Sequence, residues 1–290
     1  MFGFLKRKEE KPEEKARGKD ARSGAFQEFA AQFGPEELSI LAVTGANGFS
    51  GARMGGEDLW RLSTGLTAWM EEDGPDIHRE ETELTTLGDG RLLEFLRQRA
   101  RPDFILKFRG RVSQDGRHIL LLDLPEPGFD PDLKAILEEQ KKPVTQWVDG
   151  LGTFTLDRRV KWFEAEVDWL GQDVRLEYDQ GPEEDMKAAQ AQAKALLAGA
   201  ADWDRRVRER AADELLELAN DWSQEIEDED GGAKPVTREQ FMERMEPEAI
   251  QMDKAGCFQF WFGDGGLFCG HSILVTGSLE KGPERASMEG

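Results

Sequence analysis

The chain has 290 residues and a formal net charge of −21 at pH 7, with 38 basic and 59 acidic side chains. Eight tryptophans and 17 phenylalanines supply enough apolar surface for a packed core, which excludes a wholly disordered protein. A basic surface is needed to displace phosphate counterions, so nucleic acid is disfavoured as a partner. Two cysteines cannot staple a disulfide-rich secreted fold, and no apolar run is as long as a membrane span. We therefore expect a cytoplasmic protein without stable membrane association.

Residues 1–24 differ from the rest of the chain in charge. They carry eight basic and five acidic side chains, whereas the remainder carries 30 basic and 54 acidic ones. The apolar start, Met1 to Leu5, is too short for the core of a signal peptide, although it could touch an anionic membrane surface weakly. We expect residues 1–24 to form a disordered charged tail.

Residues 25–142 are predicted to form one α+β module. Asp115 and Gly116 favour positive φ angles and indicate a tight hairpin between two apolar runs. Asp130 followed by Pro131 is typical of the start of a helix, because aspartate caps the first turn and proline fits within it. The spacing of apolar residues predicts helices over residues 25–33, 59–70, 91–101 and 131–140, and strands over residues 38–43, 104–112 and 118–124.

Residues 143–280 are predicted to form a second α+β domain. Apolar and acidic residues alternate over residues 161–169, which indicates a strand with one buried and one solvent-exposed face. Gly171 turns the chain into another alternating run, so the two runs form an antiparallel hairpin. Further strands are expected over residues 249–252, 257–262 and 267–275, and residues 281–290 are expected to form a flexible tail.

Two helices are predicted between these strands, followed by a short third one. The second helix carries an apolar stripe that can pack on the sheet. Thr237 and Gln240 form a capping box for the short helix. Runs of strands and runs of helices predict an α+β fold of two modules, with mainly antiparallel sheets and packed helices. The stripe comprises Trp203, Val207, Ala211, Leu215, Leu218 and Trp222, and four tryptophans are expected to share one core: Trp169, Trp203, Trp222 and Trp261.

A glycine-rich motif follows the first predicted strand. Residues 44–51 read TGANGFSG and resemble the T-G-x-x-G-x-x-G loop of extended short-chain dehydrogenases, whose glycines let the backbone approach a pyrophosphate at the start of a helix. Two further glycines interrupt the segment where that helix should begin, and the chain's only tyrosine lacks a lysine four residues later. We expect Gly45, Gly48 and Gly51 to shape a loop without a bound cofactor, and an NAD(P)-dependent enzyme stays as an alternative.

The second half contains a series of short aromatic and glycine-rich pieces. They are LGTFTLDR at 151–158, Phe163, WLG at 169–171, ANDW at 219–222 and FQFWFGDGGLFCGHSILV at 258–275. In this order they resemble the bacterial family known as domain of unknown function 2262, with a similarity that spans about Trp147 to Gly277. The resemblance implies an intracellular α+β module without an assigned activity, and it carries over no catalytic or ligand residues. The first half resembles the extension of longer family members.

The last of these pieces holds candidate catalytic residues. If residues 263–266 form a four-residue hairpin loop, Cys269 and His271 lie on one face of the following strand, which would allow a thiol–imidazole pair. In that register Cys257 is not opposite Cys269, so no disulfide is expected. A closed zinc site would need a fourth ligand beyond these three, so no metal is expected. A buried free cysteine and a hydrogen-bonded histidine are the commoner roles.

Asp264 lies within the same predicted turn. Its carboxylate is expected to cap the turn, and a general acid beside His271 is the alternative. No catalytic triad, phosphate-binding loop or paired Cys-x-x-Cys motif accompanies these residues, so an enzyme is not favoured.

Three carboxylates, Glu164, Glu166 and Asp168, share the exposed face of the strand predicted over residues 161–169. Like charges on one strand face repel one another unless a basic side chain such as Arg175 compensates them. A solvated face is expected, and a binding surface for a basic protein partner is the alternative. The acidic balance favours a non-enzymatic protein-interaction module, a class that includes immunity proteins against cationic toxins.

Overall fold

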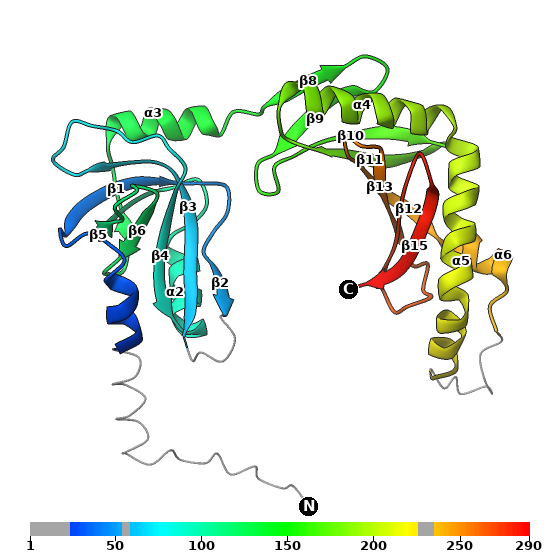
Figure 1. The fold of residues 1–290 in the computed structure, drawn as a ribbon, viewed down its shortest axis with the longest axis horizontal. Coiled ribbons are helices and arrows are strands. Elements are labelled where there is room, and N and C mark those ends of the chain that lie inside the picture. The colour runs from blue at the N-terminus through cyan, green and yellow to red at the C-terminus, as the bar shows by residue number, and fades with distance from the viewer. Residues whose placement is uncertain (1–23, 54–58, 226–234) are drawn as a thin grey trace, which may run out of the picture. The chain divides into compact units, whose positions relative to one another are not determined.

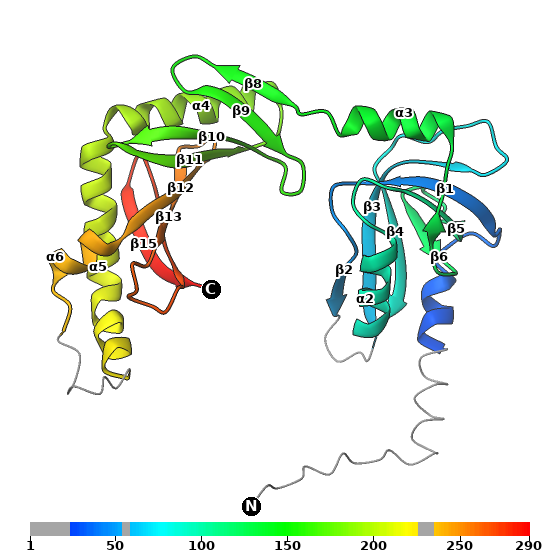
Figure 2. The same ribbon diagram turned by 180° about the vertical axis from the view of Figure 1, so that it is seen from behind.

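The computed structural model describes residues 24–53, 59–225 and 235–290. Residues 1–23 of the predicted tail therefore lie outside the described residues. The chain divides into two units, the first ending at Lys142 and the second beginning at Pro143 (Figure 1, Figure 2). Each unit has its own sheet and its own helices, which gives the predicted α+β class with two modules. None of the helices in the described segments combines the length and the apolar composition needed to cross a bilayer.

The strands of the first unit close into a barrel. They are β1 (Leu38–Thr44), β2 (Ser50–Arg53), β3 (Trp60–Glu71), β4 (Thr82–Gly88), β5 (Ile105–Val112), β6 (His118–Leu121) and β7 (Glu126–Pro127). The pairing runs from β1 through β3, β4, β6 and β5, and β5 then pairs with β1 again. The short strands β2 and β7 add to β3 and β5. The barrel therefore leaves no open edge among its five main strands.

This strand order is that of an OB-fold barrel. All neighbouring pairs are antiparallel except β4 and β6, which run parallel. Helix α2 (Gly90–Arg99), close to the helix predicted over residues 91–101, connects β4 to β5. The carboxylate of Asp89 caps the helix by accepting two backbone N–H groups of the first turn. Leu93 and Leu96 are buried in the barrel core, so α2 packs against the barrel through these two side chains.

Helix α3 (Pro131–Gln140) covers the outer face of the barrel over β1, β3 and β5. Leu133 and Leu137 are buried there in a second cluster with residues of these strands. Asp130 caps the helix and Pro131 occupies its first turn, which confirms the predicted helix start. The helix predicted over residues 25–33 is shorter and spans residues 24–30.

Residues 59–70, predicted to be a helix, form the strand β3 instead. The pairing of β1 with β3 shifts its register, because Val43 pairs with Ala68 while the next residue of β1 pairs with Leu66. This bulge changes the phase of the strand, so that the core-facing residues Leu62, Leu66 and Trp69 are spaced by four and by three positions. That spacing is the one expected of a helix, and it misled the prediction. Strand β4 was missed because threonines occupy several of its buried positions.

The second unit is an open sheet in the order β15-β14-β13-β12-β11-β10-β9-β8. Neighbouring strands are antiparallel except β11 and β12, and the three helices lie in the connection between these two. Leu170 and Gly171 form the predicted tight turn between β10 and β11, with positive φ angles of 56° and 87°. The elements are β8 (Thr145–Val148), β9 (Gly152–Asp157), β10 (Trp162–Trp169), β11 (Gln172–Asp179), α4 (Glu183–Ala198), α5 (Ala200–Glu225), α6 (Arg238–Arg244), β12 (Glu246–Met252), β13 (Cys257–Gly263), β14 (Ser272–Ser278) and β15 (Gly282–Glu289).

The core of the second unit lies on one face of this sheet. Phe163 and Trp169 of β10 face it as the alternation predicted, together with Phe260 of β13. Helices α4, α5 and α6 all contribute buried side chains to the same core, and Figure 1 shows α4 and α5 on the same side of the sheet. The predicted stripe of α5 packs into this core, and the capping box of Thr237 and Gln240 starts α6. Both predictions are therefore confirmed.

One of the four tryptophans expected in this core lies elsewhere. Trp169 is buried, and Trp203 and Trp222 pack at the edge of the cluster. Trp261 is half-buried and lies on the opposite face of β13, because it alternates with the buried Phe260 and Phe262. The prediction for Trp261 is wrong, since successive residues of a strand cannot all face one side.

The loop between β13 and β14 is longer than predicted. Gly263 pairs with Ser272, so residues 264–271 form the loop, and β14 begins later than residue 267. Residues 281–290, predicted to be a flexible tail, contain β15, which pairs with β14 at the end of the sheet. Only Ala286 is a buried apolar side chain within β15, so its alternation was too weak to indicate a strand.

Candidate functional site

The sheet face opposite the core carries no helix in the described part of the second unit. Glu164, Glu166 and Asp168 alternate with core residues on β10 and therefore point to this open face. Two of these three carboxylates stand opposite another carboxylate on β11, which is unfavourable unless a cation lies nearby. The cross-strand pairs are Glu164 with Glu177, Glu166 with Arg175, and Asp168 with Asp173.

Arg175 is the cation that compensates part of this row. Its Nε donates to Oε1 of Glu177 at 2.5 Å and lies 4.0 Å from Oε2 of Glu164. The hydrogen bond to Glu177 raises the pKa of the Arg175 guanidinium above its ordinary value. The Glu177 side chain is only 6% exposed, whereas that of Arg175 is 52% exposed. Because one guanidinium serves two carboxylates, Glu166 and Asp168 keep a local surplus of negative charge.

An apolar strip continues across the open face from Arg175. The register places Ala249 beside Arg175, Trp261 beside Ala249, and Leu274 beside Trp261. Trp261 and Leu274 are both half-buried, and the buried Ala249 between Arg175 and Trp261 carries only a methyl group. An indole ring can bind a cation through its π face. The open face therefore combines carboxylates with an aromatic surface.

The predicted catalytic residues lie in the loop over residues 264–271 and not on a strand. Asp264 is buried, and its carboxylate accepts the backbone N–H groups of Gly266, Phe268 and Gly270 at 3.2, 2.6 and 3.0 Å. Burial by itself raises the pKa of the Asp264 carboxyl, but these hydrogen bonds outweigh burial and hold the pKa below its ordinary value. Both carboxylate oxygens are engaged by the loop, so Asp264 organises the loop backbone.

Cys269 and His271 do not share a strand face as predicted, because both belong to this loop. The Nδ1 of His271 donates to the carbonyl oxygen of Phe268 at 2.7 Å, and the imidazole packs edge-on against Trp222. Cys269 is exposed and has a left-handed φ of 55°. Cys257 lies at the other end of β13. Within the described residues, no group of three or more His, Cys, Asp or Glu side chains is placed to hold a metal ion.

The glycine-rich loop of the first unit does not start a helix. The chain continues from it into β2, which pairs with β3, so the strand–loop–helix setting of a dinucleotide site is absent here. The backbone N–H of Gly45 donates to the carbonyl oxygen of Gly65 at 2.9 Å. A Cβ on Gly51 would lie 2.9 Å from the ring of Trp60, whereas Gly48 has only ordinary contacts. These glycines therefore serve a turn and a close approach to neighbouring side chains.

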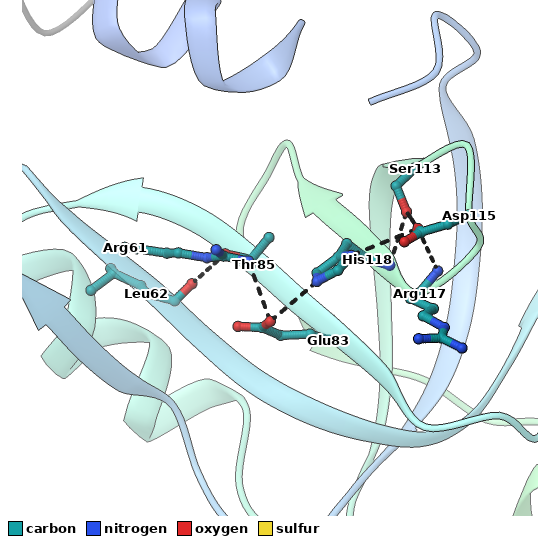
Figure 3. A network of polar contacts seen from close by, with 8 residues as sticks. All are labelled: Arg61, Leu62, Glu83, Thr85, Ser113, Asp115, Arg117 and His118. Carbon is teal, nitrogen blue, oxygen red and sulfur yellow. Dashed lines mark hydrogen bonds and ion pairs between the residues drawn. The ribbon is translucent and has the colours of Figure 1, made fainter. Parts of the chain in front are cut away.

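A polar network joins β3, β4 and β6 on the outer face of the barrel (Figure 3). Arg61 donates to the Glu83 carboxylate and to the Thr85 hydroxyl, both at 3.3 Å. The imidazole of His118 lies between two carboxylates, with Nε2 3.6 Å from Glu83 and Nδ1 3.7 Å from Asp115. These separations exceed normal hydrogen bonds. The network joins neighbouring strands through opposite charges.

Asp115 also holds the turn between β5 and β6. Its carboxylate accepts the Ser113 hydroxyl at 2.6 Å and the backbone N–H of Arg117 at 3.0 Å. Gly116 has a φ of 71° in the same turn. The hairpin predicted from the Asp-Gly pair is therefore confirmed.

Several residues of the open face were missed from sequence, among them Gln251, Gln259 and Trp261. The signal for two of them lay in the alternation over residues 257–262. Every second residue there is a phenylalanine that faces the core. Gln259 and Trp261 occupy the opposite phase, so they had to share the other face of the strand.

Comparison with known protein families matches both units. Residues 148–288 match the family model DUF2262, described as an uncharacterized protein conserved in bacteria, and residues 25–140 match DUF7021, a domain of unknown function. The resemblance predicted for the second half is confirmed, and the match extends through most of β15. No curated protein and no solved structure is significantly similar to the chain.

Proposed function

We propose that this protein is a non-enzymatic protein-interaction module. Its first unit matches DUF7021 and its second unit matches DUF2262. The DUF2262 domain binds a basic protein partner through the open face of its sheet. The observation that carries this proposal is the carboxylate row of β10 and β11, in which Arg175 is shared between Glu164 and Glu177, beside the half-buried Trp261.

The charge of the whole domain supports a basic partner. Residues 143–290 contain 32 acidic and 16 basic side chains. A surplus of one sign speeds association with a protein of the opposite sign, and salt screens this attraction. Neutralisation of a cationic toxin in the cytoplasm is one role that such a surface fits.

A charge-reversal experiment tests the proposal. The partner is captured from a lysate of the source organism at low salt, identified by mass spectrometry, purified, and titrated against the full chain by calorimetry. The triple variant Glu164→Lys, Glu166→Lys, Asp168→Lys removes the carboxylate row from an exposed surface. We expect it to weaken binding at least about tenfold, equivalent to ~1.4 kcal/mol.

The matched control makes the same change in net charge on the helices. Glu217, Glu239 and Glu243 are exposed on α5 and α6, so their replacement by lysine leaves the open face intact. Binding by this control should fall much less than binding by the first variant. A purified partner that is acidic, or one that binds both variants equally, contradicts the proposal.

A further inference from the structure

A pocket of about 360 Å³ lies at one end of the open face, between β11, β12, β13, β14 and β15. The strand register places Glu177, Gln251, Gln259 and Thr276 side by side in one row across four strands. The last three residues of this row line the pocket. Side chains opposite one another on neighbouring strands are close enough to contact a single ligand group.

The polar side chains of this row have unused hydrogen-bonding capacity. Gln251, Gln259 and Thr276 are half-buried, and none of them forms a side-chain hydrogen bond within the described residues. Each glutamine amide offers a carbonyl acceptor and two N–H donors, and the hydroxyl offers both functions. Partly buried polar groups normally find a partner, so this row is suited to a polar ligand.

Three carboxylates surround the same pocket. Asp179 ends β11, Asp253 follows β12, and Glu284 is the extra residue of a β-bulge in β15. Lys281 offsets part of this charge, since its Nζ lies 3.5 Å from Glu284. The Cys257 thiol also lines the pocket. Burial raises the pKa of Cys257, and the negative charges of Asp253 and Glu284 raise it further, which agrees with a negative potential there.

We infer that this pocket binds an arginine side chain of the basic partner. The inference rests on the proposed function, because the pocket belongs to the same open face. A guanidinium has five N–H donors in a planar fork, and the pocket offers carboxylate, amide and hydroxyl acceptors around it. A lysine ammonium has three donors around one atom, so it would leave more of these acceptors without a partner.

The two cysteines of the chain supply the test and its internal control. Cys257 lines the pocket, whereas Cys269 lies in the β13–β14 loop, and both are exposed. The full chain is treated with a bulky maleimide, and labelling of each cysteine is followed by mass spectrometry. The probe is a glycine–arginine peptide with several arginines, compared with peptides of the same length that carry lysine or citrulline instead.

The arginine peptide should protect Cys257 alone. At a concentration four times its dissociation constant, it should slow the labelling of Cys257 about fivefold by mass action and leave Cys269 unchanged. The citrulline peptide has the same shape without the charge and should not protect. Equal protection by the lysine or citrulline peptide, or equal protection of both cysteines, overturns the inference.

A pair of variants separates failure of this inference from failure of the proposed function. Asp179→Asn with Glu284→Gln removes two exposed pocket carboxylates, and Glu217→Gln with Glu239→Gln makes the same charge change on the helices. Only the first pair should abolish peptide protection of Cys257 and weaken binding of the purified partner. If the pocket variant binds the partner normally while the lysine variant of β10 does not, the inference that the pocket binds arginine is wrong. The proposal that the open face binds a basic partner is then retained.

Discussion

The amino-terminal barrel and the carboxy-terminal sheet are both built from strands that alternate apolar with polar residues, but only the barrel closes on itself. In the barrel, β1 pairs with β3 and also with β5. In the second unit, β8 and β15 remain edges, and the helices of the described residues all pack on one face. Closure gives hydrogen-bond partners to backbone N–H and C=O groups that would be unpaired at the edges of an open sheet. The open sheet instead leaves one face without a helix.

The two units also differ in how they pair their surface charges. On the outer side of β5, the basic residues Lys107, Arg109 and Arg111 each form an ion pair. On the open face of the second unit, Arg175 is shared between carboxylates, and Glu166 forms no ion pair within the described residues. The comparison indicates that the basic residues along β5 find carboxylates within their own unit, whereas the carboxylates around Arg175 outnumber this cation. The partners are Glu72 for Lys107, both Asp123 and Glu37 for Arg109, and Glu37 for Arg111.

The largest effect expected from a single change is local to one unit. Phe260 is 1% exposed in the core of the second unit, so Phe260→Ala should cost about 3–5 kcal/mol through lost burial and a residual cavity. Hydrogen–deuterium exchange of the full chain should then accelerate in β12, β13 and β14. An equal acceleration in the barrel strands would contradict the division into two units.

A smaller loss is expected from the loop that connects β13 to β14. Asp264→Asn removes charge-assisted hydrogen bonds to three backbone N–H groups and should cost about 1.5–3 kcal/mol. Because the pKa of Asp264 is lower in the folded state than its ordinary value of 3.8, this stabilisation is complete above that value. It should disappear as the pH falls through the folded-state pKa. Urea unfolding of the wild type and the variant from neutral to acidic pH measures both effects.

The exposed aspartate Asp253 provides a control for this prediction. Its carboxylate also accepts two backbone N–H groups, from Ala255 and Cys257, both at 2.8 Å. Because Asp253 is exposed, Asp253→Asn should cost less than Asp264→Asn. If the two variants lose equal stability, burial is not what makes the Asp264 loop important.

His271 should have a modest structural role. His271→Ala removes the hydrogen bond to Phe268 and the edge-on contact with Trp222, and should cost about 0.5–1.5 kcal/mol because the histidine is only half-buried. Cys269→Ala should change stability much less. Chemical denaturation compares the two variants. Unchanged stability of the His271 variant combined with lost partner binding would show that the histidine is functional.

The smallest effects should have opposite signs in the two units. Arg109→Gln removes two exposed ion pairs of the barrel, with Asp123 and with Glu37, and should cost at most about 1 kcal/mol. Asp168→Asn removes the repulsion with Asp173 on the open face and should leave stability unchanged or raise it by a few tenths of a kcal/mol, on the order of other cross-strand pairs. Thermal unfolding at low and high salt measures both. A clear loss of stability from Asp168→Asn would mean that the row already has its cation within the chain.

Local signals predicted much of the fold. The start of α3 at Asp130, the capping box at Thr237 and the turn at Asp115 were all read from residues within a few positions of one another. The alternation of β10 placed Glu164 and Glu166 on an exposed face. Each of these features depends on hydrogen bonds or side-chain directions that one short segment determines by itself.

The remainder depended on contacts between distant segments. The bulge in β3 gave a strand the spacing of a helix, and only pairing with β1 and β4 determined its conformation. The pairing of Gly263 with Ser272 moved Cys269 and His271 off the strand and into a loop. Barrel closure, and the row that joins Gln251 with Gln259 across the sheet, were settled in the same way. The sequence by itself determined caps, turns and strand faces, whereas the tertiary structure decided register and closure, because strand pairing joins residues far apart in the chain.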